Sequence, residues 1–206
     1  SQNTASGDFS AVVGGKCNTS SGNYSFIGSG NFNSSTALRA TIGGGASNTA
    51  SGIYAVIGGG ATNTNSGARA TIAGGRQNTN SNNYGALGGG CGNTTSGHSS
   101  TIAGGRGNVA SGTCSTVSGG TKNSGSGDLS TVAGGSGSIA SGTASTIGGG
   151  QQNTGSGAYS TIGGGQLNVA SDVHATVAGG CNNNASNNFG TISGGYNNCA
   201  AGYAAV

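Results

Sequence analysis

The hydrophobic and polar positions of this chain recur with a period of 15 residues that never slips. Gly-Gly pairs mark it at 14/15, 44/45, 59/60 and onward to 194/195. Cutting after every fifteenth residue gives thirteen full units and an eleven-residue remainder, with the consensus x-x-N-T-A-S-G-x-x-S-T-I-x-G-G. Self-similarity at a fixed period is the signature of a repeat architecture. We therefore interpret residues 1–206 as a single repeat array of about 13.7 units without a linker, and number the positions of each unit 1 to 15.

Position 12 is aliphatic in all thirteen full units and β-branched in twelve of them. The column consists of Val12, Ile27, Ile42, Ile57, Ile72, Leu87, Ile102, Val117, Val132, Ile147, Ile162, Val177 and Ile192. β-Branched residues favour strands, and a column this regular is expected to be buried. Position 10, on the same side of a strand, is only Ser, Ala or Gly, which predicts a narrow interior. The run S-T-I therefore predicts one short strand per unit, and the run N-T-A-S predicts a second.

Two turns separate the predicted strands. Position 7 is Gly in ten units, and Asn82, Asp172 and Asn187 replace it in three others. Because Gly, Asn and Asp are the residues that best tolerate φ > 0, we expect position 7 to be a left-handed turn residue. The second turn is expected at Gly14-Gly15 and its equivalents.

Position 3 is Asn in thirteen of fourteen units, with Ser138 as the exception. The column consists of Asn3, Asn18, Asn33, Asn48, Asn63, Asn78, Asn93, Asn108, Asn123, Asn153, Asn168, Asn183 and Asn198. In stacked coils, equivalent side chains lie about 4.8 Å apart, which suits hydrogen bonds between amides and to turn backbone. We interpret the column as a structural Asn ladder.

Units this short cannot bury a core alone, so each is expected to stack on its neighbours. The fold class that follows is an all-β β-solenoid or β-roll of 15-residue coils, with two short strands per coil. A core of one aliphatic side chain per coil is thin, and several chains that share it on a common axis would bury more surface. The pattern favours a homotrimer over a single solenoid, which remains the alternative.

The motif N-x-A-S-G-x-x-S-T-I/V-x-G-G, as in residues 48–60, 108–120 and 153–165, resembles the head repeats of YadA-like trimeric autotransporter adhesins. The resemblance extends over essentially the whole chain. It implies a left-handed β-roll of three parallel chains, exposed on a cell or particle surface and adhering to matrix, host or other cells. The chain departs from the usual head unit, which is slightly shorter and reads S-V-A-I-G.

Position 9 collects six of the ten aromatic residues together with two arginines. The resulting contact stripe consists of Phe9, Tyr24, Arg39, Tyr54, Arg69, Tyr84, Tyr159 and Phe189. Alternating Tyr and Arg on adjacent coils are expected to stack with cation–π contacts. Two interpretations stay open: lateral packing that shields the turn edge, and a contact surface for carbohydrate or protein, since Tyr and Arg are enriched at interfaces.

The remaining composition argues against several function classes. A net charge of +3 from six Lys and Arg is too small for tracking nucleic-acid phosphates, and no apolar run is long enough to span a membrane. Glu is absent, and Asp172 with His174 lacks the third member of a catalytic triad. The five Cys fall in four columns, with neither metal-ligand spacing nor disulfide geometry. We predict no enzyme activity and no catalytic, cofactor or metal site.

These patterns predict a non-enzymatic extracellular structural or adhesive fibre segment, as in a surface filament or adhesin head. Its expected partners are copies of itself, as a homotrimer or end-to-end filament, and a host matrix, glycan or neighbouring-cell surface. An ice-binding β-solenoid and a lectin-like carbohydrate-binding rod are the alternatives. Against ice binding, the Thr rank at position 11 is single and interrupted by Phe26, Val56 and Ala86, and position 4 is Thr in only seven of fourteen units.

Overall fold

The computed structural model describes residues 2–202. They form an all-β β-solenoid with about 15 residues per turn, because each strand pairs in parallel with the strand one unit away, as Thr49 does with Thr64. Two short strands occur in each turn, which confirms the predicted fold class. The chain divides after Gly105 into two compact units, called unit 1 and unit 2.

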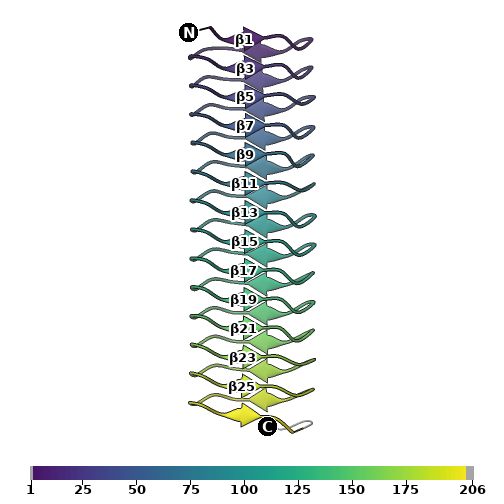
Figure 1. Ribbon diagram of the computed structural model, residues 1–206, viewed down its shortest axis with the longest axis vertical. Coiled ribbons are helices and arrows are strands. Elements are labelled where there is room, and N and C mark those ends of the chain that lie inside the picture. Colours follow the sequence, from purple (N-terminus) through teal and green to yellow (C-terminus); the bar gives the residue numbers. More distant parts are fainter. Residues whose placement is uncertain (1, 203–206) are drawn as a thin grey trace. The chain divides into compact units, whose positions relative to one another are not determined.

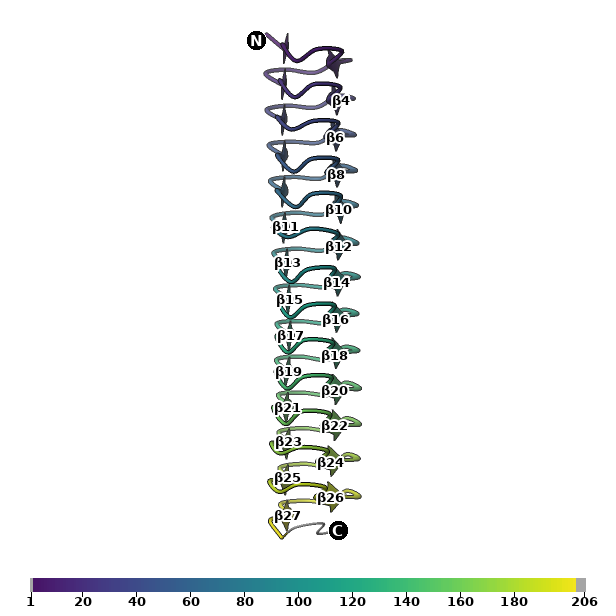
Figure 2. The ribbon, with the colours of Figure 1, turned by 90° about the vertical axis from the view of Figure 1, so that its right-hand side faces the viewer.

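In unit 1, odd-numbered strands form one parallel sheet, sheet A, and even-numbered strands form another, sheet B. Sheet A contains β1 (Thr4–Ala5), β3 (Thr19–Ser20), β5 (Ser34–Ser35), β7 (Thr49–Ala50), β9 (Thr64–Asn65), β11 (Thr79–Asn80) and β13 (Thr94–Thr95). Sheet B contains β2 (Ala11–Val12), β4 (Phe26–Ile27), β6 (Thr41–Ile42), β8 (Val56–Ile57), β10 (Thr71–Ile72), β12 (Ala86–Leu87) and β14 (Thr101–Ile102). The labelled strands of sheet A follow one another in Figure 1, and the view in Figure 2 separates the two sheets.

Unit 2 repeats this arrangement. Its sheet A contains β15 (Val109–Ala110), β17 (Ser124–Gly125), β19 (Ile139–Ala140), β21 (Thr154–Gly155), β23 (Val169–Ala170), β25 (Asn184–Ala185) and β27 (Cys199–Ala200). Its sheet B contains β16 (Thr116–Val117), β18 (Thr131–Val132), β20 (Thr146–Ile147), β22 (Thr161–Ile162), β24 (Thr176–Val177) and β26 (Thr191–Ile192). In each strand the second residue faces the interior and the first faces outward, as the two-residue period of a strand requires.

The aliphatic column at position 12 fills the interior within a single chain. From Ile27 to Val177 every member is at most 1% exposed, and Ile192 is 6% exposed. Val12, in the first coil, is half-buried. Burial of the column is therefore complete without a second chain, so the thin core does not by itself require the shared axis that led us to expect a trimer.

Small residues beside this column compensate one another in volume. Position 5 of sheet A faces position 10 across the interior, and a large residue at one is matched by a small one at the other. Asn80 lies opposite Gly85, where an added Cβ would overlap the Asn80 amide oxygen. Gly125 lies opposite Ser130, whose Oγ would be 3.3 Å from a Cβ added to the glycine. Each coil therefore keeps the same interior width although its residues differ.

The expectation of a left-handed residue at position 7 is wrong. Asn82, Asp172 and Asn187 do not have positive φ values; the non-Gly residues that do occupy positions 9 and 2. The Asn and Asp side chains serve another purpose: Oδ1 of Asp172 accepts the N–H of Val173 at 2.7 Å, and Asn82 and Asn187 accept the following N–H at 2.8 Å. Gly at position 7 answers to space instead, because a Cβ on Gly52 would overlap the Gly67 carbonyl oxygen of the next coil.

We predict that Ile72→Ala lowers the free energy of unfolding by about 2–5 kcal/mol, because it leaves a cavity in a closed column. Thr71→Ala, on the outward side of the same strand β10, is the matched control and should change it by less than about 0.5 kcal/mol. Urea unfolding followed by circular dichroism measures both. Equal midpoints for the two variants would contradict the role assigned to the column.

Candidate binding surface

The side chains of position 9 are presented by a β-turn whose third residue is left-handed. The turn closes by a hydrogen bond from position 10 to position 7, as from Ala55 N–H to the Gly52 carbonyl at 3.0 Å. The φ angle of position 9 is 60° at Tyr54 and 55° at Arg39. Each position-9 N–H in turn donates to the preceding coil, as Tyr54 does to the Leu38 carbonyl at 3.0 Å. Backbone that is fixed on both sides gives this column a defined direction.

In unit 1 the column forms a continuous stack, which we call the Tyr–Arg stack: Phe9, Tyr24, Arg39, Tyr54, Arg69 and Tyr84. The rings of Phe9 and Tyr24 lie 5.0 Å apart at 13°. The Arg39 guanidinium carbon lies 5.4 Å from the ring centroids of both Tyr24 and Tyr54. The Arg69 carbon lies 5.5 Å from Tyr54 and 5.7 Å from Tyr84. Each guanidinium is therefore sandwiched between two phenol rings, as cation–π attraction favours.

The faces of the inner groups in this stack are covered, whereas their edges remain open to solvent. Tyr24 and Tyr84 are 50% exposed and Tyr54 is 38% exposed. Arg39 Nη1 donates to the Tyr54 hydroxyl at 2.7 Å, and Arg69 Nη1 donates to the Tyr84 hydroxyl at 3.2 Å. The stack thus presents a line of alternating hydroxyl groups and guanidinium edges.

Unit 2 contains a shorter aromatic stack that includes a residue missing from the predicted stripe. His174 lies between Tyr159 and Phe189, with ring centroids 5.1 and 5.0 Å away and planes within 11°. Sequence reasoning had weighed His174 only as a partner of Asp172, although its place at position 9 was the signal that assigns it to the column. Elsewhere the column carries Cys114, Leu129 and Ala144, so the eight predicted stripe residues belong to two separate stacks.

The Asn column lines the interior at the second turn and is occupied with internal hydrogen bonds. Asn63 is representative: its N–H donates to Asn48 Oδ1 at 3.0 Å. Its Nδ2 donates to the carbonyls of Gly59 and Gly75 at 3.1 and 2.9 Å. Asn3 and Asn198, in the first and last coils, are exposed. Because the side-chain atoms are used to stabilise turn backbone, the column is structural.

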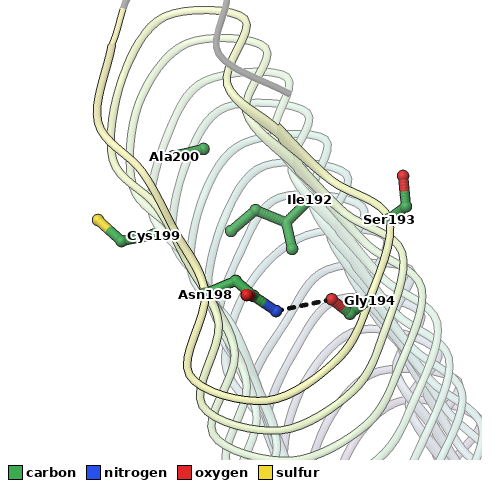
Figure 3. Close-up of a pocket in the computed structure, with 6 residues that line it drawn as sticks. All are labelled: Ile192, Ser193, Gly194, Asn198, Cys199 and Ala200. Carbon is green, nitrogen blue, oxygen red and sulfur yellow. Dashed lines mark hydrogen bonds between the residues drawn. The ribbon is translucent and has the colours of Figure 1, made fainter.

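A pocket of about 330 Å³ lies at the last described coil of unit 2. Figure 3 shows its lining in cross-section: Ile192 points between the walls of the coil, and Cys199 points outward. Asn198 Nδ2 donates to the Gly194 carbonyl at 2.9 Å. The lining consists of the same column residues as the other coils, so the pocket is the open end of the described interior and offers no group for acid–base chemistry.

The other chemistry-bearing side chains remain apart. Within residues 2–202, no three His, Cys, Asp or Glu side chains come together as a metal site would require. All five cysteines are free thiols. The described chain also contains no helix that is long and apolar enough to cross a membrane.

Fold and surface together define a β-solenoid repeat protein with an exposed Tyr–Arg stack. No protein-family model matches the chain, and no curated protein is significantly similar to it. The argument for function therefore depends on the geometry of the described residues.

The one gap in the Asn column allows a test of its energetic role. Ser138 Oγ accepts the Asn153 N–H at 3.3 Å, but its short side chain cannot supply the two amide donors that other members direct to turn carbonyls. We predict that Ser138→Asn raises the free energy of unfolding by about 1 kcal/mol, the usual net value of a buried hydrogen bond. Ser136→Asn, at an exposed position nearby, is the control. A fall in the Ser138→Asn urea midpoint would contradict the prediction.

Proposed function

We propose that this chain is a non-enzymatic structural and adhesive segment of an extracellular fibre, such as a surface filament or adhesin head. The observation that carries the proposal is the Tyr–Arg stack, which exposes residue types enriched in binding hot spots. Its members are fixed by turn hydrogen bonds and by stacking, so that little conformational entropy is lost when a partner binds. The resemblance of the repeat motif to YadA-like adhesin heads supports the same function.

The scaffold suits an element that holds such a surface outside a cell. Backbone hydrogen bonds join neighbouring coils within each unit at the strands and at both turns, as from Ala46 N–H to the Gly60 carbonyl at 2.9 Å. Charged residues are 4% of the chain, which leaves the outer faces of the sheets nearly neutral. Location on a cell or particle surface, and a matrix, glycan or neighbouring-cell partner, are parts of this proposal.

Self-association is a further part of the proposal. The resemblance implies three parallel chains, but the aliphatic column of each unit is already closed. A homotrimer of this chain would therefore pack through the outer faces of its sheets, where side chains such as Phe26 and Val56 are 38% and 37% exposed. An end-to-end filament would instead pair the strands of terminal coils.

Adhesion of protein-coated beads to immobilised matrix and to cells under flow tests the proposal. We predict that Tyr54→Ser weakens bead adhesion by about tenfold or more, because Tyr54 is the ring that both arginines contact and a hot-spot truncation costs about 2 kcal/mol. Tyr196→Ser is the matched control, since Tyr196 is 74% exposed but lies outside position 9. Wild-type beads that adhere no better than albumin-coated beads would refute the adhesive function.

A second candidate, ice binding, is favoured by one specific observation. On the outer side of sheet A in unit 1, positions 4 and 6 both carry hydroxyl groups in all seven coils. They are Thr4, Thr19, Ser34, Thr49, Thr64, Thr79 and Thr94, with Ser6, Ser21, Thr36, Ser51, Ser66, Ser81 and Ser96. Coils spaced about 4.8 Å and alternate strand residues about 6.6 Å apart make this a regular two-dimensional array. Such an array is able to order surface water, which the single Thr rank of position 11 does not.

Thermal hysteresis separates this candidate from the adhesive function. If sheet A of unit 1 binds ice, the wild type shows hysteresis, and Thr64→Tyr abolishes it by interrupting the flat array. Thr71→Tyr, exposed on sheet B of the same unit, should leave it intact. Absence of hysteresis in the wild type at millimolar concentration would eliminate the ice-binding candidate.

A further inference from the structure

We propose that the Tyr–Arg stack binds a linear anionic polysaccharide, whose sulfate or carboxylate groups contact the guanidinium edges of Arg39 and Arg69. This inference rests on the proposed adhesive function, because it names the chemical class of the partner. Three features of the stack lead to it: its uncompensated charge, the exposed geometry of the guanidinium groups, and their spacing.

The charge of the two arginines is not neutralised by carboxylates along the chain. No acidic residue occurs between Asp8 and Asp128, a segment that includes both arginines. The groups in contact with Arg39 and Arg69 are phenol rings and hydroxyls, which are neutral. The Tyr–Arg stack is therefore a site of positive potential on a nearly uncharged surface, and it attracts anions.

The exposed part of each guanidinium is its planar edge. Tyrosine rings cover both faces of Arg39 and of Arg69, so further ligands have access only in the plane of the group. Nη1 already donates to a tyrosine hydroxyl in each case, and the other N–H groups lie in the same plane. Such an edge matches the oxygens of a carboxylate or sulfate, which accept parallel charge-assisted hydrogen bonds.

The two arginines are separated by two coils, a distance of about 10 Å at the usual spacing of strands, with the Tyr54 hydroxyl between them. A polysaccharide that carries one anionic group per disaccharide presents charges at a comparable interval, with sugar hydroxyls between them that can bond to Tyr54. An acidic peptide strand would present side chains of one face about 6.6 Å apart, which does not match.

Nucleic acid fits the stack less well than a glycan does. Two cations are few for a phosphate backbone, where affinity grows with the number of neutralised phosphates. Nucleobases bind single-strand proteins by stacking on open aromatic faces, but Tyr54 has an arginine on each side of its ring. The shorter stack of Tyr159, His174 and Phe189 in unit 2 carries no arginine, so we assign the site to unit 1 alone.

Binding of the full chain to immobilised heparin, with neutral dextran as the reference surface, tests the inference. We expect the wild type to bind heparin but not dextran. Arg39→Gln/Arg69→Gln should weaken binding by about tenfold or more, as expected for the loss of charge-assisted hydrogen bonds. Arg76→Gln/Arg106→Gln removes the same charge at exposed positions outside the stack, and should weaken binding less than about twofold. Circular dichroism melting verifies that both variants fold.

Arg39→Lys/Arg69→Lys retains both charges but replaces the planar edges. It should bind heparin more weakly than the wild type, because an ammonium group cannot form the parallel pair of hydrogen bonds. Equal losses in the two Gln variants would show that only net charge matters and would overturn the inference, as would undiminished binding of the Lys variant. Equal competition by single-stranded DNA would assign the site to polyanions in general and would also overturn it.

Failure of this inference is distinguishable from failure of the proposed function. If wild-type beads adhere to matrix or cells and excess heparin does not displace them, the adhesive function stands and the anionic-glycan partner is refuted. If wild-type beads adhere to no surface, the adhesive function fails even when soluble protein binds heparin.

Discussion

Hydrogen bonding between equivalent positions of successive coils is the constraint on which the remaining structure depends. A 15-residue coil cannot satisfy its own backbone groups, so nearly every donor must find an acceptor one coil away. The Asn column extends this principle to the interior of the second turn, where Asn63 donates to carbonyls of two coils. An inserted residue would misalign the bonded positions of every later coil, which explains why the period never changes over 206 residues.

Constant coil width is the second requirement, and it explains the monotony of the interior columns. One aliphatic side chain and two small residues fill each coil, and replacement on one side is balanced on the other, as between Asn80 and Gly85. A cross-section this narrow leaves no cavity in which a catalytic group could be desolvated. Function is therefore expected on the outside of the coil, where side chains do not determine the packing.

Position 9 meets that condition better than any other column. Its residues accept the strain of a left-handed backbone, which costs about 1 kcal/mol for a non-Gly residue, and their side chains stay outside the coil. Because the interior is insensitive to their identity, the same backbone position carries Tyr54, Arg69, Cys114 or His174. Stacking at the coil spacing then turns neighbouring residues into an ordered surface, and the order of Tyr and Arg along the column sets its chemistry.

The sequence by itself determined the period, the two strands per coil, the buried aliphatic column and the Asn column, because each recurs in every coil and reports a local requirement. It did not locate the left-handed residues: Asn82, Asp172 and Asn187 suggested position 7, whereas their side chains bond to the next N–H and φ is positive at positions 9 and 2. Nor did it show that one chain closes the core, or that His174 stacks between Tyr159 and Phe189. Backbone angle, burial and ring contacts in these coils depend on atoms 15 residues away, and only the stacked tertiary structure brings those atoms together.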